Sequence, residues 1–209
     1  KLVTAAAAGP VIGGATVRYR NSSFAVGGGH AKLTTGSYNT AAGMSAQESL
    51  TTGSYNTAAG MSAQYSLTTG SSNTASGHAA QQFLTTGSYN TATGYAAQYL
   101  LTTGSHNTAA GYAAQYLLTT GSYNTASGYA AQYSLTTGSF NTAIGYGAGY
   151  TGSSATVNGS VAIGCDSTGV GAIVTADNTV VLGTPLHSLK CGAVGTDSGL
   201  WAFGVKKDA

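Results

Sequence analysis

The chain has 209 residues, but 32 glycines, two prolines and only 6% charged residues are unusual for one globular domain of that length. Its net charge of +2 includes no basic cluster, which argues against nucleic acid because phosphate binding needs several Lys or Arg side chains on one face. No apolar run is long enough to span a bilayer and no signal-peptide pattern is present, so no membrane insertion is expected. Cys165 and Cys191 have no CxxC or Cys/His spacing, so neither a disulfide framework nor a metal or cofactor site is expected.

The first part of the chain leads into a repetitive array. Residues 1–20 are rich in Ala and Gly, contain Pro10, and predict a short extended lead-in. Residues 21–31 are a divergent copy of the core of the repeat that follows. The repetitive part is therefore expected to begin before Leu33 and to cover residues 21–151.

Seven copies of a 17-residue unit, L-T-T-G-S-Y-N-T-A-A-G-Y-A-A-Q-Y-S in consensus, follow each other without a gap from Leu33 to Thr151. A fixed period this short does not fit a helical hairpin repeat, and it predicts a chain that winds one coil per repeat and stacks each coil on the last. At roughly 4.8 Å per coil, seven coils make a rod of about 34 Å. The expected fold is all-β, a parallel β-roll or β-solenoid.

Ten of the 17 columns never change, and they indicate what each coil requires. Gly36 and Gly43 predict corners that need a positive φ or a close backbone approach. Ser37 to Ala42 alternates with period two and predicts a strand. The unvarying Leu is assigned to the interior, and the unvarying Asn, Ser and Thr are expected to bond coil to coil as polar ladders.

The variable columns describe the surface. One column reads Tyr38, Tyr55, Ser72, Tyr89, His106, Tyr123, Phe140, a second Met44, Met61, His78, Tyr95, Tyr112, Tyr129, Tyr146, and a third Glu48, Tyr65, Gln82, Tyr99, Tyr116, Tyr133, Tyr150. The first two columns, which accept such different residues, are expected to face water. Stacked Tyr rings with outward hydroxyls suit sugar stacking or contact with a protein, but the favoured interpretation is that they only cover the rod or pack between chains. The third column is open to the same two interpretations. The candidate binding residues are Tyr89, Tyr95, Tyr99, Tyr112, Tyr116, Tyr123, Tyr129 and Tyr133.

Beyond the array, Ser160 to Ser167 and Asn178 to Gly183 repeat the same core at looser spacing, with β-branched residues in place of small ones. Residues 152–190 are therefore expected to form divergent coils, and residues 191–209 a separate C-terminal segment.

These motifs resemble known fibre repeats. Ser160 to Ser167 is similar to Asn-Ser-Val-Ala-Ile-Gly-x-x-Ala, the signature of the head of trimeric autotransporter adhesins, and Asn39 to Ala46 matches it more loosely. That resemblance implies a left-handed parallel β-roll built from three identical chains. The array resembles still more the Thr-Thr-Gly-Ser-x-Asn-Thr-Ala-x-Gly-Tyr repeats of phage tail fibres. This second resemblance implies a fibre shaft in the virion that contacts a host receptor or surface glycan, with a bacterial surface or extracellular adhesin as the alternative.

The C-terminal end resembles the same fibres. Asn178 to Leu189 is similar to the segment ahead of their self-cleaving intramolecular chaperone. Residues 196–198 and 206–208 loosely match the chaperone's opening motifs, which implies that residues 191–209 are the junction to such a domain. Gly199 stands where the family has Asp, so the resemblance does not extend to cleavage at Ser198.

No enzyme is expected, because the few acids form no recognisable constellation with a histidine and a nucleophile, and paired carboxylates are absent from the array. Residues 27–29 lack the following Lys and helix of a phosphate-binding loop. Two further alternatives stay open. The first is an ice-binding solenoid, since Thr at a fixed spacing could form a flat lattice that matches ice, although the neighbouring Tyr columns argue against it. The second is a self-assembling amyloid-like filament, since an uncovered roll end would permit end-to-end stacking.

Overall fold

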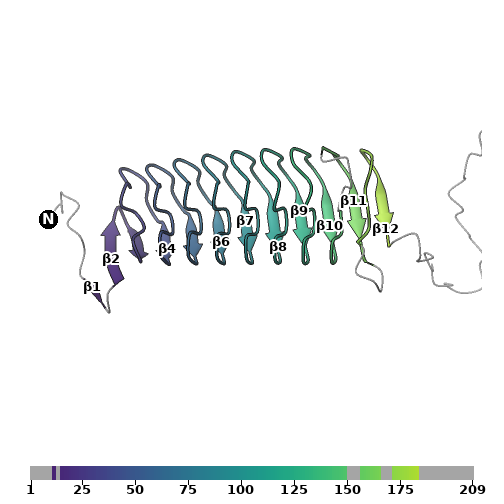
Figure 1. Cartoon of the computed structure of the whole chain (residues 1–209). Coiled ribbons are helices and arrows are strands. Elements are labelled where there is room, and N and C mark those ends of the chain that lie inside the picture. Colours follow the sequence, from purple (N-terminus) through teal and green to yellow (C-terminus); the bar gives the residue numbers. More distant parts are fainter. Residues whose placement is uncertain (1–10, 13–14, 150–155, 166–170, 184–209) are drawn as a thin grey trace, which may run out of the picture.

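The computed structural model describes residues 11–12, 15–149, 156–165 and 171–183. It confirms an all-β parallel solenoid, in which one strand per coil lies beside the next along a rod (Figure 1). No helix occurs in the part of the chain described, and none long and apolar enough to cross a membrane was found there. Tyr150, His187, Cys191 and the chaperone-like motifs at 196–198 and 206–208 lie outside the described residues.

Twelve strands follow in chain order, and neighbours in sequence are neighbours in space. Their bounds are β1 (Val11–Ile12), β2 (Ala15–Arg20), β3 (Ser23–Val26), β4 (Thr40–Ala42), β5 (Thr57–Ala59), β6 (Thr74–Ser76), β7 (Thr91–Thr93), β8 (Thr108–Ala110), β9 (Thr125–Ser127), β10 (Thr142–Ile144), β11 (Val161–Ile163) and β12 (Val180–Leu182).

The strand register reproduces the sequence period. Thr40 pairs in parallel with Thr57, its equivalent in the next repeat, and the same step recurs as far as β10. The divergent segments beyond the array extend the same ladder with a longer step, from Thr142 to Val161 and from Val161 to Val180. Longer coils therefore still present their strands at the same edge of the rod.

The strand within each coil is shorter than predicted. Ser37 to Ala42 was expected to be extended, but β4 begins only at Thr40, because Tyr38 has a left-handed φ of 59° that interrupts the extended backbone. The predicted alternation holds from Asn39 onward, with Asn39 and Ala41 buried and their neighbours exposed. Ser37 is half-buried, so it lies at the corner and not on the inner face of a strand.

The two invariant glycines meet the predicted requirements to different extents. Gly43 has a φ of 144°, in the region that favours glycine, and a Cβ built on it would overlap the carbonyl oxygen of Gly60 in the next coil. Gly36 does not have a left-handed φ, but a Cβ built on it would overlap the carbonyl oxygen of Gly53 in the next coil. Close approach therefore applies at both corners, and a positive φ at the corner of Gly43 alone.

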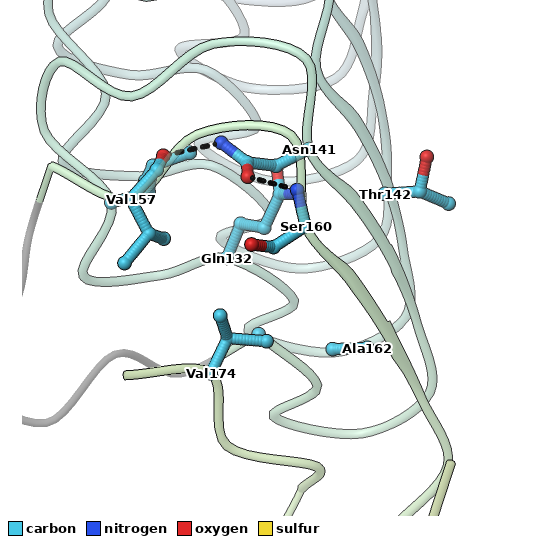
Figure 2. A pocket seen from close by; sticks show the side chains of 9 residues that line it. Gln132, Asn141, Thr142, Val157, Ser160, Ala162 and Val174 are labelled. Carbon is cyan, nitrogen blue, oxygen red and sulfur yellow. Dashed lines mark hydrogen bonds between the residues drawn. The ribbon is translucent and has the colours of Figure 1, made fainter. Parts of the chain in front are cut away.

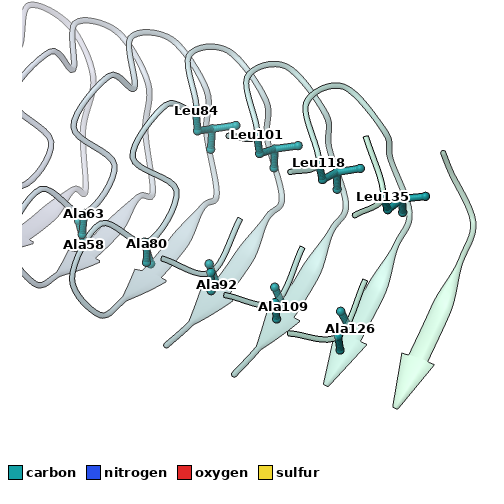
Figure 3. Packing of buried hydrophobic residues seen from close by; sticks show 14 of the residues in the cluster. Ala58, Ala63, Ala80, Leu84, Ala92, Leu101, Ala109, Leu118, Ala126 and Leu135 are labelled. Atoms are coloured by element: carbon teal, nitrogen blue, oxygen red, sulfur yellow. The ribbon is translucent and has the colours of Figure 1, made fainter. Parts of the chain in front are cut away.

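The apolar core is a narrow row of small and medium side chains. The seven Leu residues that open the repeats are fully or almost fully buried, as predicted, and the buried Ala columns lie opposite them. Figure 3 shows Leu84, Leu101, Leu118 and Leu135 at equivalent places in successive coils. With so little apolar volume in each coil, the interior depends on polar ladders as well.

The expected polar ladders are present. Nδ2 of Asn56 donates to Oδ1 of Asn39 at 3.1 Å and to the carbonyl oxygen of Gly70 at 2.9 Å, and this pattern recurs along the array. The Ser and Thr columns bond to the next coil through the backbone: Ser54 Oγ accepts from the Ser37 amide, and Thr34 Oγ1 donates to the Thr51 carbonyl. Each buried Asn therefore has its donors and acceptor paired, as burial requires.

A second buried amide ladder was not predicted from the sequence. It runs through Gln47, Gln64, Gln81, Gln98, Gln115 and Gln132, with each Nε2 donating to the next Oε1 at 2.8–3.0 Å. The Gln column is not one of the ten invariant columns, because the seventh copy has Gly149 at this position. The signal was nevertheless present, since six successive copies keep Gln while the column that follows it varies from Glu48 to Tyr65 and Gln82.

The N-terminal coil is capped by a hairpin. β2 pairs antiparallel with β3, and the two-residue turn between them, Asn21 and Ser22, has left-handed φ values of 47° and 59°, typical of a type I′ turn. Arg18 Nη1 donates to the carbonyl oxygens of Gly28 and Gly29 at 2.8 and 3.1 Å. The segment expected as an extended lead-in therefore contributes a strand that covers the first edge of the parallel ladder.

Replacing one Gln of the buried ladder should destabilise the rod strongly. Gln98→Ala leaves Gln81 Nε2 without an acceptor and Gln115 Oε1 without a donor, and each buried unpaired group costs roughly 1–3 kcal/mol. We expect the free energy of unfolding, measured by urea titration, to fall by at least about 2 kcal/mol.

The matched control is Gln82→Ala in the same coil, whose side chain is half-buried and lies outside the ladder. Its unfolding free energy should stay within about 0.5 kcal/mol of the wild type. Equal effects of the two substitutions would contradict the role assigned to the ladder.

Candidate binding surface

Three aromatic columns contain all the predicted site residues. We call them the Tyr38, Met44 and Glu48 columns after their first members. The large residues of the Tyr38 and Met44 columns are exposed except His78, which is half-buried, so both columns face water as expected. Tyr99, Tyr116 and Tyr133 of the Glu48 column are half-buried.

The Tyr38 column is an interrupted stack. Tyr38 stacks on Tyr55 with ring centroids 5.1 Å apart. After the ringless Ser72, a second stack contains Tyr89, His106, Tyr123 and Phe140, with centroids 4.7–5.0 Å apart and planes within 8° of parallel.

The Met44 column becomes aromatic at its third copy and stays so. His78, Tyr95, Tyr112, Tyr129 and Tyr146 stack with centroids 4.9–5.1 Å apart. The interplanar angles are 6–7°, so consecutive rings cover each other's faces.

The Glu48 column contains a shorter stack of Tyr99, Tyr116 and Tyr133, with centroids 4.9 and 5.2 Å apart. The pKa of Tyr116 is raised, first by burial and then by the hydroxyl groups of Tyr99 and Tyr133, with smaller contributions from Tyr95 and Tyr112. These last two belong to the Met44 column.

The stacking limits what the predicted site residues can bind. Five of the eight lie between two stacked rings: Tyr95, Tyr112, Tyr116, Tyr123 and Tyr129. Sugar stacking needs a free ring face, so these five offer only ring edges and hydroxyls. Of the remaining three, Tyr99 stacks on Tyr116 and meets Phe83 with the ring planes at 90°. Tyr133 is followed by Tyr150, which lies outside the described residues, while Tyr89 has a face next to Ser72.

The outer face of the sheet is a second surface. Its two columns are Thr40, Thr57, Thr74, Thr91, Thr108, Thr125, Thr142, Val161, Val180 and Ala42, Ala59, Ser76, Thr93, Ala110, Ser127, Ile144, Ile163, Leu182. Along the array these residues are small and mostly exposed. At the C-terminal end the same face becomes aliphatic, with Val180 66% and Leu182 46% exposed.

A small internal pocket lies where the Gln ladder ends. Gly149 supplies no side chain beyond Gln132, and the space is lined by Gln132, Val174 and neighbouring coils (Figure 2). Asn141 closes one side by donating to the Val157 carbonyl at 2.7 Å while its Oδ1 accepts from the Ser160 amide at 3.0 Å. Within the described ranges, no three His, Cys, Asp or Glu side chains come together as a metal site would require.

Comparisons with protein-family models, with curated proteins and with solved structures give no match for this chain. A function for this chain must therefore be inferred from the geometry of its residue columns.

His30 is a buried ionisable group at the start of the Gln ladder. It occupies the column of Gln47 one coil earlier, and its Nε2 lies 2.7 Å from Gln47 Oε1, while Nδ1 has no partner. Burial lowers the pKa of His30 from 6.5, the hydrogen bond with Gln47 opposes that shift, and the Arg18 charge adds to it. The ring is therefore neutral in the folded protein at pH 7.

This lowered pKa should make stability depend on pH. Below about pH 6.5 the unfolded chain binds a proton at His30 more readily than the folded chain does, so stability falls as the pH drops toward the folded-state pKa. We expect the urea midpoint to decrease from pH 7.5 to pH 5, and His30→Gln to flatten that decrease.

The control for this measurement is His106→Tyr, which places the commonest residue of the Tyr38 column at an exposed site. It should keep the wild-type pH dependence. A pH profile unchanged by His30→Gln would show that His30 is not responsible.

Proposed function

We propose that this chain is a shaft segment of an extracellular fibre of the phage tail fibre type, assembled as a homotrimer. The observation that carries the proposal is the constant period: the buried Leu and Asn columns continue through all seven coils of the array, and the buried Gln column continues through the first six. Such a rod resists bending, because any change of coil spacing breaks several buried ladders together. Its function is to hold its two ends a fixed distance apart.

The outer sheet face supports association between copies. Ile163, Val180 and Leu182 are exposed at its C-terminal end, and an aliphatic sheet face of this kind gains free energy when it is covered. Three copies related by a threefold axis along the rod would cover this face in each chain. The resemblance of Ser160 to Ser167 to trimeric β-roll heads also supports three chains.

Attachment to a host receptor or surface glycan is proposed as a property of the exposed columns. The same features fit a bacterial trimeric surface adhesin, and its stalk or anchor would distinguish that alternative. We propose no catalytic activity for this chain.

Ice binding is a second candidate, favoured by one observation. Threonines recur at every coil on the exposed outer sheet face, beside a column of Ala, Ser and Thr. A regular, flat array of hydroxyl and methyl groups is what an ice lattice would require. A thermal-hysteresis measurement tests this function directly.

The mass of the native particle tests the trimer. Light scattering on the purified protein should give close to three times the chain mass of 20.5 kDa. The double substitution Ile163→Asp and Val180→Asp should shift the particle toward single chains, because the carboxylates would be desolvated at the interface.

The control variant is Gln82→Glu, in a column where Glu48 already places an acid, and it should keep the trimer. A wild-type mass of one chain would overturn the trimeric fibre and favour a free-standing solenoid with its Thr face open. Retention of the trimer in the double variant would show that this face is not the interface.

A further inference from the structure

The Tyr38 column lacks a ring at one coil only. Ser72 stands between Tyr55 and Tyr89, while the other six copies have Tyr, His or Phe. Tyr55 stacks on Tyr38 and Tyr89 stacks on His106, so each has its opposite ring face directed toward the level of Ser72. The structure assigns to this place a binding slot, walled by Tyr55 and Tyr89 with Ser72 at its base, that takes one planar aromatic ring.

The neighbouring coils give the width of the slot. Tyr89 and Tyr123 are also two coils apart, and the imidazole of His106 fills the space between them at 4.8 Å from one centroid and 4.7 Å from the other. Because the coil period is constant, Tyr55 and Tyr89 are separated by the same two steps. The slot is therefore as wide as a space that a flat ring fills elsewhere in the same column.

Backbone hydrogen bonds hold the walls at this separation. The Ser72 amide donates to the Ser54 carbonyl at 2.9 Å, and the Tyr89 amide donates to the Ser71 carbonyl at 3.0 Å. The slot is therefore preformed, and a ligand does not have to order the rod.

The exposed fractions agree with uncovered ring faces. Tyr55 and Tyr89 are 63% and 60% exposed, whereas Tyr123, which has a ring on each side, is 53% exposed. The planes of Tyr38 and Tyr55 also deviate by 15° from parallel, more than in any other stacked pair of the described residues.

A comparable gap in the Glu48 column is already occupied. Gln82 interrupts that column before Tyr99, but the adjacent Phe83 places its ring edge-on to Tyr99, with the centroids 5.0 Å apart and the planes at 90°. The third repeat therefore lacks a ring in two columns, at Ser72 and at Gln82, and Phe83 of the same repeat occupies the gap at Gln82. No described ring takes the equivalent place at Ser72.

The ligand follows from the shape and charge of the slot. Two parallel aromatic faces favour a flat ring in offset stacking. A pyranose is thicker, because its carbons carry substituents above and below the ring, so it does not match a gap of one flat ring. Between Lys32 and Asp166 the sole charged residue of the Asp, Glu, Lys and Arg types is Glu48, so nothing selects a charged ring. The ligand class is a neutral planar aromatic ring, such as an aromatic side chain.

Aromatic-ring NMR spectra of the full chain labelled at tyrosine test this assignment. N-acetyl-tryptophanamide is titrated as the aromatic probe, N-acetyl-leucinamide as the aliphatic control and methyl α-glucopyranoside as the sugar arm. The tryptophan probe should cause saturable shifts of the Tyr55 and Tyr89 ring signals, and the other two should not.

Two variants provide matched controls. Ser72→Tyr closes the slot with the residue that four of the seven copies carry in this column, and the Ser72 φ of 58° matches the 59° of Tyr89, so folding should be retained. Its affinity for the probe should fall at least tenfold. His106→Ser should open a second slot between Tyr89 and Tyr123, adding a second bound equivalent and new shifts at Tyr123.

Equal affinity in the wild type and in Ser72→Tyr would overturn the slot. So would equal shifts from the leucine control, and shifts from the glucoside alone would show that the ligand is a sugar. The slot belongs to one chain and goes beyond the proposed fibre function, so a trimer measured by light scattering with no probe binding would disprove the slot without affecting the fibre.

Discussion

The structure depends on one constraint: each buried Asn and Gln of the array bonds to the same side chain one coil away. Asn39 Oδ1 accepts from both the backbone amide and Nδ2 of Asn56, and Gln47 donates to Gln64. Such groups are costly to bury unless every partner is present. An insertion within a coil would misalign the Asn, Gln and Leu columns together. This explains why all seven copies keep the same length while their surface positions change.

The aromatic columns follow from the same constraint. Ring centroids 4.7–5.2 Å apart occur in the stacked pairs whether they join Tyr to Tyr, Tyr to His or Tyr to Phe. The backbone step of one coil sets this distance, and the rings adapt to it by stacking. A surface substitution therefore alters not only its own site but also the ring faces above and below it, as at Ser72.

The two ends of the described rod differ in how the parallel strand ladder is flanked. At the N-terminal end the β2–β3 hairpin covers the strand edge, and Arg18 satisfies two carbonyl groups there. At β11 and β12 the coils lengthen and the outer face changes from hydroxyl-bearing to aliphatic residues. Covered edges limit uncontrolled end-to-end pairing, while an aliphatic face favours side-by-side association. This asymmetry is compatible with a shaft that assembles laterally.

The solenoid, the buried Leu column and the Asn ladder could be predicted from the residues alone, because each follows from a fixed period and an unvarying residue. Burial of the Gln column could not, since a lone Gln side chain favours solvent and is buried here because an equivalent Gln lies one coil away. The residues alone also did not show which glycine needs a left-handed φ or which ring faces are free. Those features depend on backbone angles and on distances between equivalent residues of successive coils, and these are set when the coils stack.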